Sequence, residues 1–185
     1  MSAPGATRAP EPWSGPGVVL RAFEWSDEAD LAEAFTDPAV ATWNPGPAEG
    51  ALAFMRERND WSAGTHASWA VTETAAGPAG TRLLGSVSLH KIDRDQGDAE
   101  VGYWVAPWAR GRRLGAAPAA AAAAYGFERL GLHRVYLFHA VENPASCAVA
   151  RRAGFLLEGT LRQSYRYPDG RHHDEHLHAR LVTDR

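Results

Sequence analysis

Cysteine is almost absent from this chain of 185 residues, whose only example is Cys147. One cysteine cannot form an internal disulfide, which excludes a disulfide-stapled fold and favours a reducing compartment. The chain also lacks any apolar run near the roughly 18 residues that a membrane-spanning helix needs. Residues 1–17 are rich in Pro, Gly and Ala and contain no apolar block typical of a secretion signal. We therefore expect a soluble, cytoplasmic protein with a flexible N-terminal tail over residues 1–17.

An excess of charge of either sign is missing as well. The 19 Lys and Arg residues and 22 Asp and Glu residues give a formal net charge of −3 at pH 7. This balance provides no general attraction to nucleic acid or to anionic lipid, so we expect neither nucleic-acid nor membrane partners. The hydrophobic content of 45% is ordinary for a globular protein, and the length suits one domain, which we expect over residues 18–183.

Strand and helix patterns alternate along this expected domain. Short apolar runs bounded by turn residues predict strands, while helical spacing and Ala-rich composition predict helices. Strands are predicted over residues 18–23, 67–72, 83–89, 100–105, 133–140, 155–165 and 174–182, and helices over residues 26–37, 47–61, 116–130 and 144–153. A strand–helix–strand step requires a parallel pair, whereas the short turns between earlier strands indicate antiparallel pairing. The fold class is therefore α/β (α+β), a mixed sheet with helices on its faces.

The loop before the Ala-rich helix carries the strongest chemical signal. It reads Arg110-Gly111-Arg112-Arg113-Leu114-Gly115. Backbone N–H groups at a helix start lack partners within the helix and together carry about half a positive charge. Such an end binds phosphate, and glycines let the ligand approach the backbone. The loop therefore predicts an anion site, the alternative being a solvated basic turn before a surface helix.

Several segments in the right order resemble the GNAT superfamily of N-acetyltransferases. They are residues 102–115, 131–135, 143–146, 154–159 and 169–174. Within the superfamily they are most similar to the RimJ/RimL-like branch, which acetylates ribosomal-protein N-termini. The resemblance covers roughly residues 18–182 and implies a single-domain GNAT fold, with about seven strands and about four helices.

The resemblance also implies acetyl-CoA as cosubstrate. It implies a sheet that splays between the fourth and fifth predicted strands, with pantetheine in the gap against the backbone of Val105. The loop Arg110 to Gly115 would bind the pyrophosphate, and Asn143 and Ser146 would line the thioester end. One departure is Arg113, which stands where the family usually has Gly and would either crowd the pyrophosphate or form a salt bridge with it.

Acetyl transfer from a thioester to an amine needs a hydrogen-bond donor for the departing thiolate and a path for the proton of the amine. Ser146 is the leading donor by resemblance, although Asn143-Pro144 also fits a helix start that would make both polar residues capping groups. Tyr165 is a second donor candidate. Glu100 is the candidate base, ahead of His90 and Glu158.

Histidines gather near the end of the chain at His172, His173, His176 and His178, with Asp174 among them. We expect exposed histidines near a turn and no metal, because zinc ligands usually come from separated positions and no cysteine stands nearby in sequence. Cys147 is expected to point into the core as a small apolar residue.

The tryptophans are expected to pack the core or to line an acceptor cleft. The four concerned are Trp25, Trp43, Trp61 and Trp69. We thus expect an acetyl-CoA-dependent N-acetyltransferase acting on an amine, with a protein N-terminus implied by resemblance. A small amine acceptor, such as an antibiotic or polyamine, and a non-catalytic acyl-CoA-binding module stay open, and we allow for a homodimer.

Overall fold

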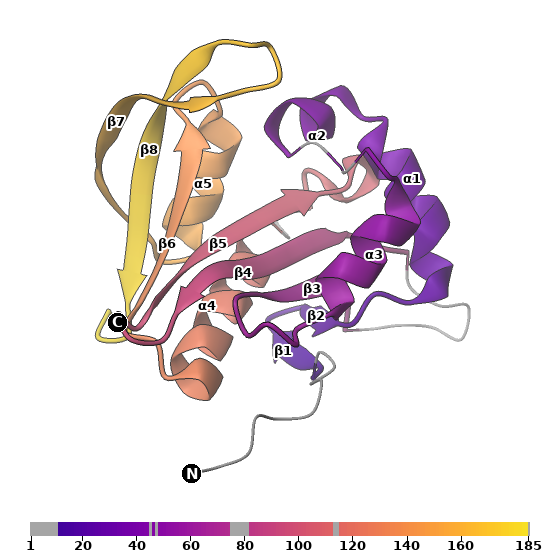
Figure 1. Cartoon of the computed structure of the whole chain (residues 1–185), viewed down its shortest axis with the longest axis horizontal. Helices are drawn as coiled ribbons and strands as arrows, with labels where there is room; N and C mark the ends of the chain where they lie inside the picture. The colour runs from indigo at the N-terminus through magenta and orange to yellow at the C-terminus, as the bar shows by residue number, and fades with distance from the viewer. Residues whose placement is uncertain (1–10, 45, 47, 75–81, 113–114, 185) are drawn as a thin grey trace.

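One eight-stranded sheet runs through the molecule in the order β1-β2-β3-β4-β5-β6-β8-β7 (Figure 1). The computed structural model describes residues 11–44, 46, 48–74, 82–112 and 115–184. The strands are β1 (Trp13–Gly15), β2 (Val18–Arg21), β3 (Ala67–Glu73), β4 (Gly85–Asp93), β5 (Asp98–Val105), β6 (Arg134–Ala140), β7 (Leu156–Arg166) and β8 (His172–Leu181). Neighbouring strands pair antiparallel except β5 and β6, which are parallel. The mixed sheet predicted from the sequence is confirmed.

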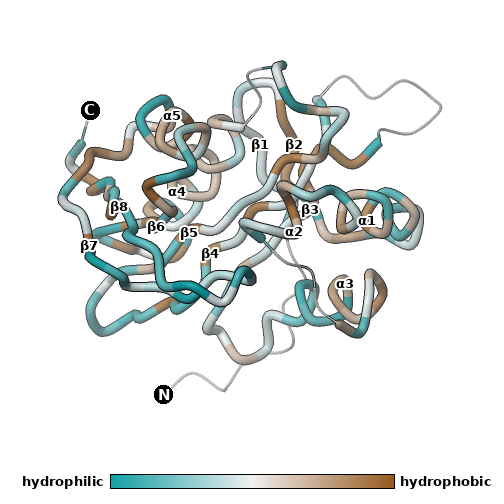
Figure 2. The backbone as a smooth tube through the Cα atoms, turned by 90° about the horizontal axis from the view of Figure 1, so that it is seen from above, coloured by the Kyte–Doolittle hydropathy of each residue, from teal (hydrophilic) through white to brown (hydrophobic). Residues whose placement is uncertain are grey.

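Helices cover both faces of this sheet. They are η1 (Trp25–Asp27), α1 (Glu28–Phe35), α2 (Pro38–Trp43), α3 (Ala51–Asn59), η2 (Pro107–Ala109), α4 (Ala116–Leu130) and α5 (Pro144–Arg152). Figure 2 shows α4 and α5 on one side of the strands and α1 and α3 on the other. The described residues contain no helix that is both long and apolar enough to cross a membrane.

The N-terminal boundary lies earlier than the sequence predicts. Strand β1 falls inside the expected tail, where Trp13 pairs with Leu20 and Gly15 with Val18. Trp13 also packs edge-to-face on Tyr125 of α4, with ring centroids 5.5 Å apart. The sheet therefore begins at Trp13 and has eight strands, because a three-residue edge strand can be held by packing that its own short sequence does not signal. Residues 1–10 lie outside the described residues.

Pro38 begins a helix that the sequence analysis did not predict. Asp37 is the N-cap of α2, and its side chain accepts from the backbone N–H groups of Ala39 and Val40 at 3.0 and 2.9 Å. Pro38 follows at N1, where the missing N–H costs nothing. The proline was expected only to end the preceding helix, so α2 was missed and the chain has one α-helix more than predicted in its described part.

The Ala-rich helix α4 follows its prediction over Ala116–Leu130. Gly131 ends it in the left-handed conformation with φ of 70°, which glycine adopts without steric cost. Pro118 lies in the first turn, where no intrahelical hydrogen bond is lost. The bounds could be predicted because both end signals are local.

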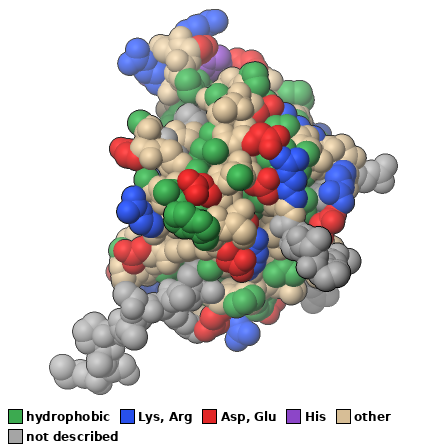
Figure 3. Space-filling view, turned by 90° about the vertical axis from the view of Figure 1, so that its right-hand side faces the viewer, with side chains coloured by type: hydrophobic (Ala, Val, Ile, Leu, Met, Phe, Trp, Pro, Cys, Tyr) green, Lys and Arg blue, Asp and Glu red, His purple; other side chains and the backbone are tan. Residues whose placement is uncertain are grey.

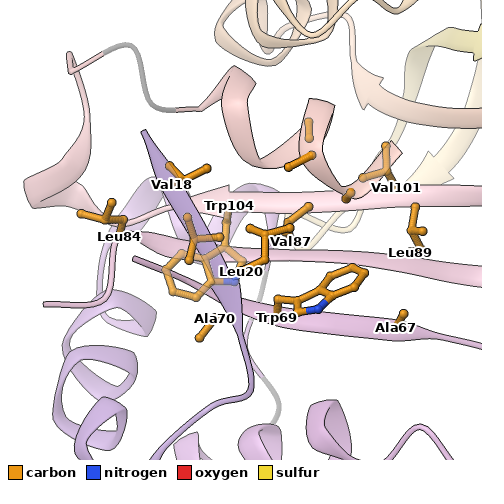
Figure 4. Close-up of a cluster of buried hydrophobic side chains, with 14 of the residues drawn as sticks. Val18, Leu20, Ala67, Trp69, Ala70, Leu84, Val87, Leu89, Val101 and Trp104 are labelled. Carbon is orange, nitrogen blue, oxygen red and sulfur yellow. The ribbon is translucent and has the colours of Figure 1, made fainter. Parts of the chain in front are cut away.

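Buried residues of β2 to β5, together with residues of α1, α3 and α4, form the hydrophobic core, part of which is drawn in Figure 4. Trp69 is fully buried, and its ring lies 5.0 Å from Trp61 and 4.9 Å from Tyr125 in edge-to-face contacts. Such aromatic pairs add about 0.5–1.5 kcal/mol beyond the area that they bury. Trp61 and Trp69 are therefore core residues, whereas Trp25 is 73% exposed.

The parallel ladder between β5 and β6 is short. It joins only Asp98, Ala99 and Glu100 to residues 134–136. Beyond Glu100 the two strands diverge, as Figure 1 shows. From there to Val105, the edge of β5 that faces β6 has no paired strand in the described sheet. The splay between the fourth and fifth predicted strands is thereby confirmed, and it opens a gap beside α5.

Candidate active site

A cleft of about 630 Å³ lies at this divergence. Its walls are the end of β5, helix α2, the turn before α4 and one side of α5. The segments that the sequence analysis marked for coenzyme binding therefore meet here: Val105, Arg110, Gly111 and Gly115 from one side, and Asn143 and Ser146 from the other. Arg113 and Leu114 lie outside the described residues.

The start of α4 faces this cleft through Gly115 and Ala116. Gly115 is the N-cap and provides no side-chain cap, so the first N–H groups of the helix have no such partner among the described residues. A Cβ at Gly115 would lie 3.0 Å from Val149 Cγ2, which explains why a residue without a side chain stands between α4 and α5. Gly111 has φ of 76°, a conformation that favours glycine.

Two arginines of the loop are already paired with carboxylates. Arg110 makes a two-pronged contact with Asp37, with Nη2–Oδ1 and Nη1–Oδ2 distances of 2.5 and 3.1 Å. This contact is the main reason that the pKa of Asp37 is lowered, with the N–H of Val40 contributing next. Arg112 is paired with Glu73 on β3. Both carboxylate partners come from distant parts of the chain, so these ion pairs could not be predicted from the loop sequence.

Arg152, in the last turn of α5, is a cation that the sequence analysis missed. It lines the same cleft and has no carboxylate partner among the described residues. No sequence motif marked Arg152, because only the packing of helix α5 on the sheet brings this residue to the cleft.

Ser146 and Tyr103 meet across the gap between β5 and α5. The phenol oxygen lies 2.8 Å from Ser146 Oγ and donates to the Ser146 carbonyl at 3.2 Å. Asn143 caps α5 by accepting from the backbone N–H of Ser146 at 3.1 Å, and Pro144 occupies N1. The capping interpretation of Asn143 is therefore confirmed, and Ser146 lies beside Tyr103 in the lining of the cleft.

Burial raises the pKa of Tyr103 to about 12, and the hydrogen bond with Ser146 opposes this only partly. The phenol therefore keeps its proton at neutral pH and can act as a donor. Tyr103 stood inside the motif quoted from the sequence without a role assigned to it. Its alternation with Val101 and Val105 along β5 was the signal available, because it directs all three side chains to one face.

A family model described as an acetyltransferase (GNAT) domain matches residues 18–156. The chain belongs to the GNAT acetyltransferase family. The family and fold expected from the motifs are thus confirmed, and the match ends where β7 begins.

Two curated relatives align with half of this GNAT chain. The Bacillus subtilis protein YdaF, whose name proposes a ribosomal N-acetyltransferase, is 42% identical over 92 residues, which are 50% of each chain. The Escherichia coli ribosomal-protein-serine acetyltransferase is 34% identical over 101 residues, covering 54% of this chain and 55% of its own. The GNAT chain thus spans about half the length of the curated relatives it matches.

Solved structures share the whole fold at lower identity. Mycobacterium smegmatis RimJ in complex with CoA-disulfide has a TM-score of 0.78 and 21% identity, with 95% of this chain and 88% of that chain covered. The spermidine N-acetyltransferase from Vibrio cholerae in complex with CoA and spermine has a TM-score of 0.75 and 23% identity, with coverages of 91% and 97%. These likenesses extend the GNAT fold over β7 and β8.

Glu100 of this GNAT domain lies where the β5–β6 ladder ends, outside the residues that line the cleft. Its carboxylate accepts from Lys91 Nζ at 2.7 Å and lies 3.6 Å from His90 Nε2. Burial lowers the pKa of His90, while the charge of Glu100 acts in the opposite direction. His90 and Glu100 are therefore one cross-strand pair and not two separate candidates.

Two other candidates lie away from the cleft. Tyr165 is 57% exposed on the outer strand β7 and packs on Tyr167, with ring centroids 5.0 Å apart. Glu158 forms an ion pair with Arg134 at 2.5 Å, which lowers the pKa of the carboxyl. Neither residue is brought to Ser146, because β7 lies beyond β8 at the far edge of the sheet.

The C-terminal histidines divide into two sets. His173 lies 2.9 Å from Asp169 and 3.2 Å from Glu142, and these carboxylates raise its pKa. His172 is exposed, as expected, but His178 is fully buried, which corrects the expectation of an exposed group. Asp174 accepts from the backbone N–H of Gln163 and does not join the buried set.

Trp43 and Cys147 take different places from most of the core. Trp43 lines the cleft and packs edge-to-face on Tyr167, with ring centroids 5.5 Å apart, so it links α2 to the β7–β8 hairpin. Cys147 is half-buried, and its Sγ lies 3.9 Å from His178 Nε2. The prediction that Cys147 points into the apolar core is therefore wrong, because its thiol lies beside an imidazole.

Proposed function

We propose that this chain is an acetyl-CoA-dependent N-acetyltransferase that transfers acetyl directly to an amine. The observation that carries the proposal is the cleft itself, which joins an uncapped helix start at Gly115 to the Tyr103–Ser146 pair. A phosphate-binding end and a hydrogen-bond donor within one groove are what a long thioester of coenzyme A requires. Membership in the GNAT family supports the same activity.

Coenzyme binding is assigned to the two walls of the cleft. The free edge of β5 up to Val105 can pair with the amide groups of an extended pantetheine, as an added strand would. The N–H groups of Gly111, Gly115 and Ala116 can hold the pyrophosphate, and Arg152 supplies a cation with no carboxylate partner in the described part of the chain. Arg110 contributes by fixing α2 through Asp37.

The Tyr103–Ser146 pair serves the departing sulfur in this proposal. The phenol of Tyr103 donates to the Ser146 carbonyl and holds its oxygen 2.8 Å from Ser146 Oγ, and Ser146 would turn its own hydroxyl proton to the sulfur as negative charge develops there. Burial raises the pKa of Tyr103, so the phenol keeps its proton and its hydrogen bond to the Ser146 carbonyl at neutral pH.

The amine proton can leave through solvent toward Glu100. The carboxylate is held by Lys91 at the point where β5 and β6 separate, and the side chain of Glu100 is 15% exposed. Its distance from the cleft lining means that water would carry the proton. An amine that is already partly neutral needs no stronger base.

We assign a protein N-terminal α-amine as the acceptor class ahead of polyamines. The described lining of the cleft includes Arg110 and Arg152 but no carboxylate, so a polycation would meet no opposite charge there. An N-terminal amine has a lower pKa than an alkyl amine and reaches the neutral form more easily. Relatives named for ribosomal-protein acetylation support this choice.

The decisive experiment measures thiol release from acetyl-CoA with N-terminal peptides, polyamines and aminoglycosides as acceptors. Release that depends on the peptide, with a matching acetylated product by mass, is expected. Release with polyamines alone would move the acceptor class to small amines. Coenzyme binding without any acceptor-dependent release would leave a non-catalytic acyl-CoA-binding module.

We also propose a reducing cytoplasmic compartment, which suits the single cysteine. A second proposal is a homodimer that forms through the outer strand β7. Leu156, Leu157 and Leu161 on this edge strand are 65%, 46% and 39% exposed, and an exposed apolar edge favours pairing with another chain. Light scattering after size exclusion should give twice the mass of the monomer, and Leu157→Glu should halve it. A monomeric wild type would contradict the proposal.

The charge distribution on the face that carries α1 and α3 gives no support to a nucleic-acid partner. Figure 3 shows Lys and Arg mixed with Asp and Glu over the face that carries α1 and α3. On this face Arg82 is paired with both Asp30 and Glu33. Nucleic-acid binding surfaces instead concentrate one sign of charge.

A further inference from the structure

Four side chains that acetyl transfer does not use converge between the sheet and α5. They are His139 of β6, Cys147 of α5, and His176 and His178 of β8. Each offers one nitrogen or sulfur atom, and these four atoms all lie within 4.8 Å of one another.

The sheet register brings the three histidines to one face. His176 is the direct partner of His139 across the β6–β8 ladder, and His178 follows two residues along the same strand. The ring of His139 lies 5.2 Å from that of His178 in a stacked contact and 5.3 Å from that of His176 at 89°. Cys147 completes the group from α5, with Sγ 3.9 Å from His178 Nε2.

Several ring nitrogens of these histidines are buried and lack hydrogen-bond partners among the described residues. His139 and His178 are 4% and 0% exposed. Nε2 of His139 and Nδ1 of His176 and His178 are inaccessible and have no hydrogen-bond partner among the described residues. A buried polar group without a partner costs about 1–3 kcal/mol, so several together in one place point to a ligand.

The protonation of the cluster suits a cation. His139 Nδ1 lies 2.8 Å from the Ala140 carbonyl, which fixes the N–H on that side and leaves the Nε2 lone pair facing the cluster. A backbone carbonyl behind a ligating histidine is the usual arrangement in metal sites.

We propose that His139, Cys147, His176 and His178 form a tetrahedral site for Zn²⁺ or a similar transition-metal ion. Three imidazoles and one thiolate are a ligand set that zinc prefers, and they come from three separate elements, as structural zinc ligands commonly do. Zinc–ligand bonds of about 2.0–2.3 Å imply ligand separations of roughly 3.3–3.6 Å, so small side-chain rotations close the set.

A metal ion here has a structural role. Four protein ligands leave no open position, which separates such a site from catalytic zinc. The ion would tie α5 to β6 and β8, and it would do so through the residue that follows Ser146. The first turn of α5, which lines the cleft, would then be held in place. The proposal does not rest on acetyl transfer and can fail or succeed independently of it.

The test uses the full chain, stripped of metal with a chelator and titrated with Zn²⁺ and then with Co²⁺. One equivalent should bind per chain, and cobalt should give the visible absorption of a tetrahedral site together with a near-ultraviolet thiolate band. Cys147→Ser should lose the thiolate band and weaken zinc binding by at least tenfold. Absence of stoichiometric binding to the wild type would overturn the site.

The matched control is His172→Ala, which removes an exposed histidine from the same strand and should leave the cobalt spectrum unchanged. Equal effects of His172→Ala and Cys147→Ser would overturn the assignment. A measurement on the wild type guards against a variant that folds poorly: zinc should slow alkylation of Cys147, the only cysteine, by at least tenfold. An unchanged alkylation rate would also refute the site.

Discussion

The phenol of Tyr103 lies 2.8 Å from the hydroxyl of Ser146, although 43 positions separate the two residues in sequence. Tyr103 comes from β5 and Ser146 from α5, so the hydrogen bond bridges the gap that opens where β5 and β6 diverge. Both residues line the cleft in which the proposed thioester would lie.

Ser146→Ala should lower turnover by roughly 10- to 100-fold while changing coenzyme affinity much less, because the hydroxyl is needed as the thiolate departs. Steady-state thiol release and calorimetric titration with coenzyme A separate the two quantities. Ser14→Ala, at an exposed position of β1, is the control and should change neither. Equal losses of turnover and affinity would instead make Ser146 a structural residue.

Tyr103→Phe should remove a pH dependence of stability at high pH. Burial raises the pKa of Tyr103 to about 12 in the folded state, whereas the unfolded chain releases the phenol proton near the ordinary tyrosine pKa of 10.0. The wild type therefore loses stability as pH rises between these values, by roughly 2–3 kcal/mol in all. Urea unfolding at several values from about pH 9 to about pH 11 should show a steeper loss for the wild type. Parallel curves would refute the buried, protonated phenol.

Arg110→Gln and Asp37→Asn should each weaken coenzyme A binding by roughly two- to fivefold, if Arg110 acts by holding α2. Asn is a good N-cap, so Asp37→Asn removes the ion pair without removing the cap. The double variant should be no weaker than either single variant, since both break the same contact. Tighter binding by Asp37→Asn would instead mean that a released Arg110 binds the pyrophosphate directly.

Arg152→Gln should weaken coenzyme A binding by roughly tenfold, since a hydrogen bond to a charged group contributes about 1.5–3 kcal/mol. The loss should shrink as salt is added, because screening already reduces the contribution of this arginine. Arg151→Gln makes the same charge change at the neighbouring position, which does not line the cleft. Similar losses for both variants would show that only the net charge matters.

Gly115→Val should reduce both stability and coenzyme binding. Its Cβ would lie 3.0 Å from Val149 Cγ2, and the branched methyls would push α5 from α4 at a cost of about 1–3 kcal/mol. Gly159→Ala on β7 is the control, since an added Cβ there meets nothing within 4 Å. Thermal unfolding and coenzyme titration would measure the two effects. A fully stable Gly115→Val protein would contradict the close packing.

Much of the fold follows from local signals in the sequence. The composition of Ala116–Leu130 and the following Gly131 predict α4 with both ends, and Asn143-Pro144 predicts the start of α5. These features could be read from the sequence because helix propensity, capping and turn formation depend on residues a few positions apart. Strand β1 was missed for the opposite reason, since packing of Trp13 on Tyr125 supports it. Helix α2 does have a local signal, Asp37-Pro38, but this proline was interpreted only as the end of the preceding helix.

The sequence by itself determined most of the elements, their order and the loop that we propose as the coenzyme site. Only the tertiary structure decided which side chains meet: Arg110 with Asp37 across 73 positions, Tyr103 with Ser146, and the cluster of His139, Cys147, His176 and His178. Such pairings depend on strand order and register, because β8 inserts between β6 and β7 and brings its histidines to His139. A one-residue change of register would turn those histidines to the other face, and no local pattern specifies that choice.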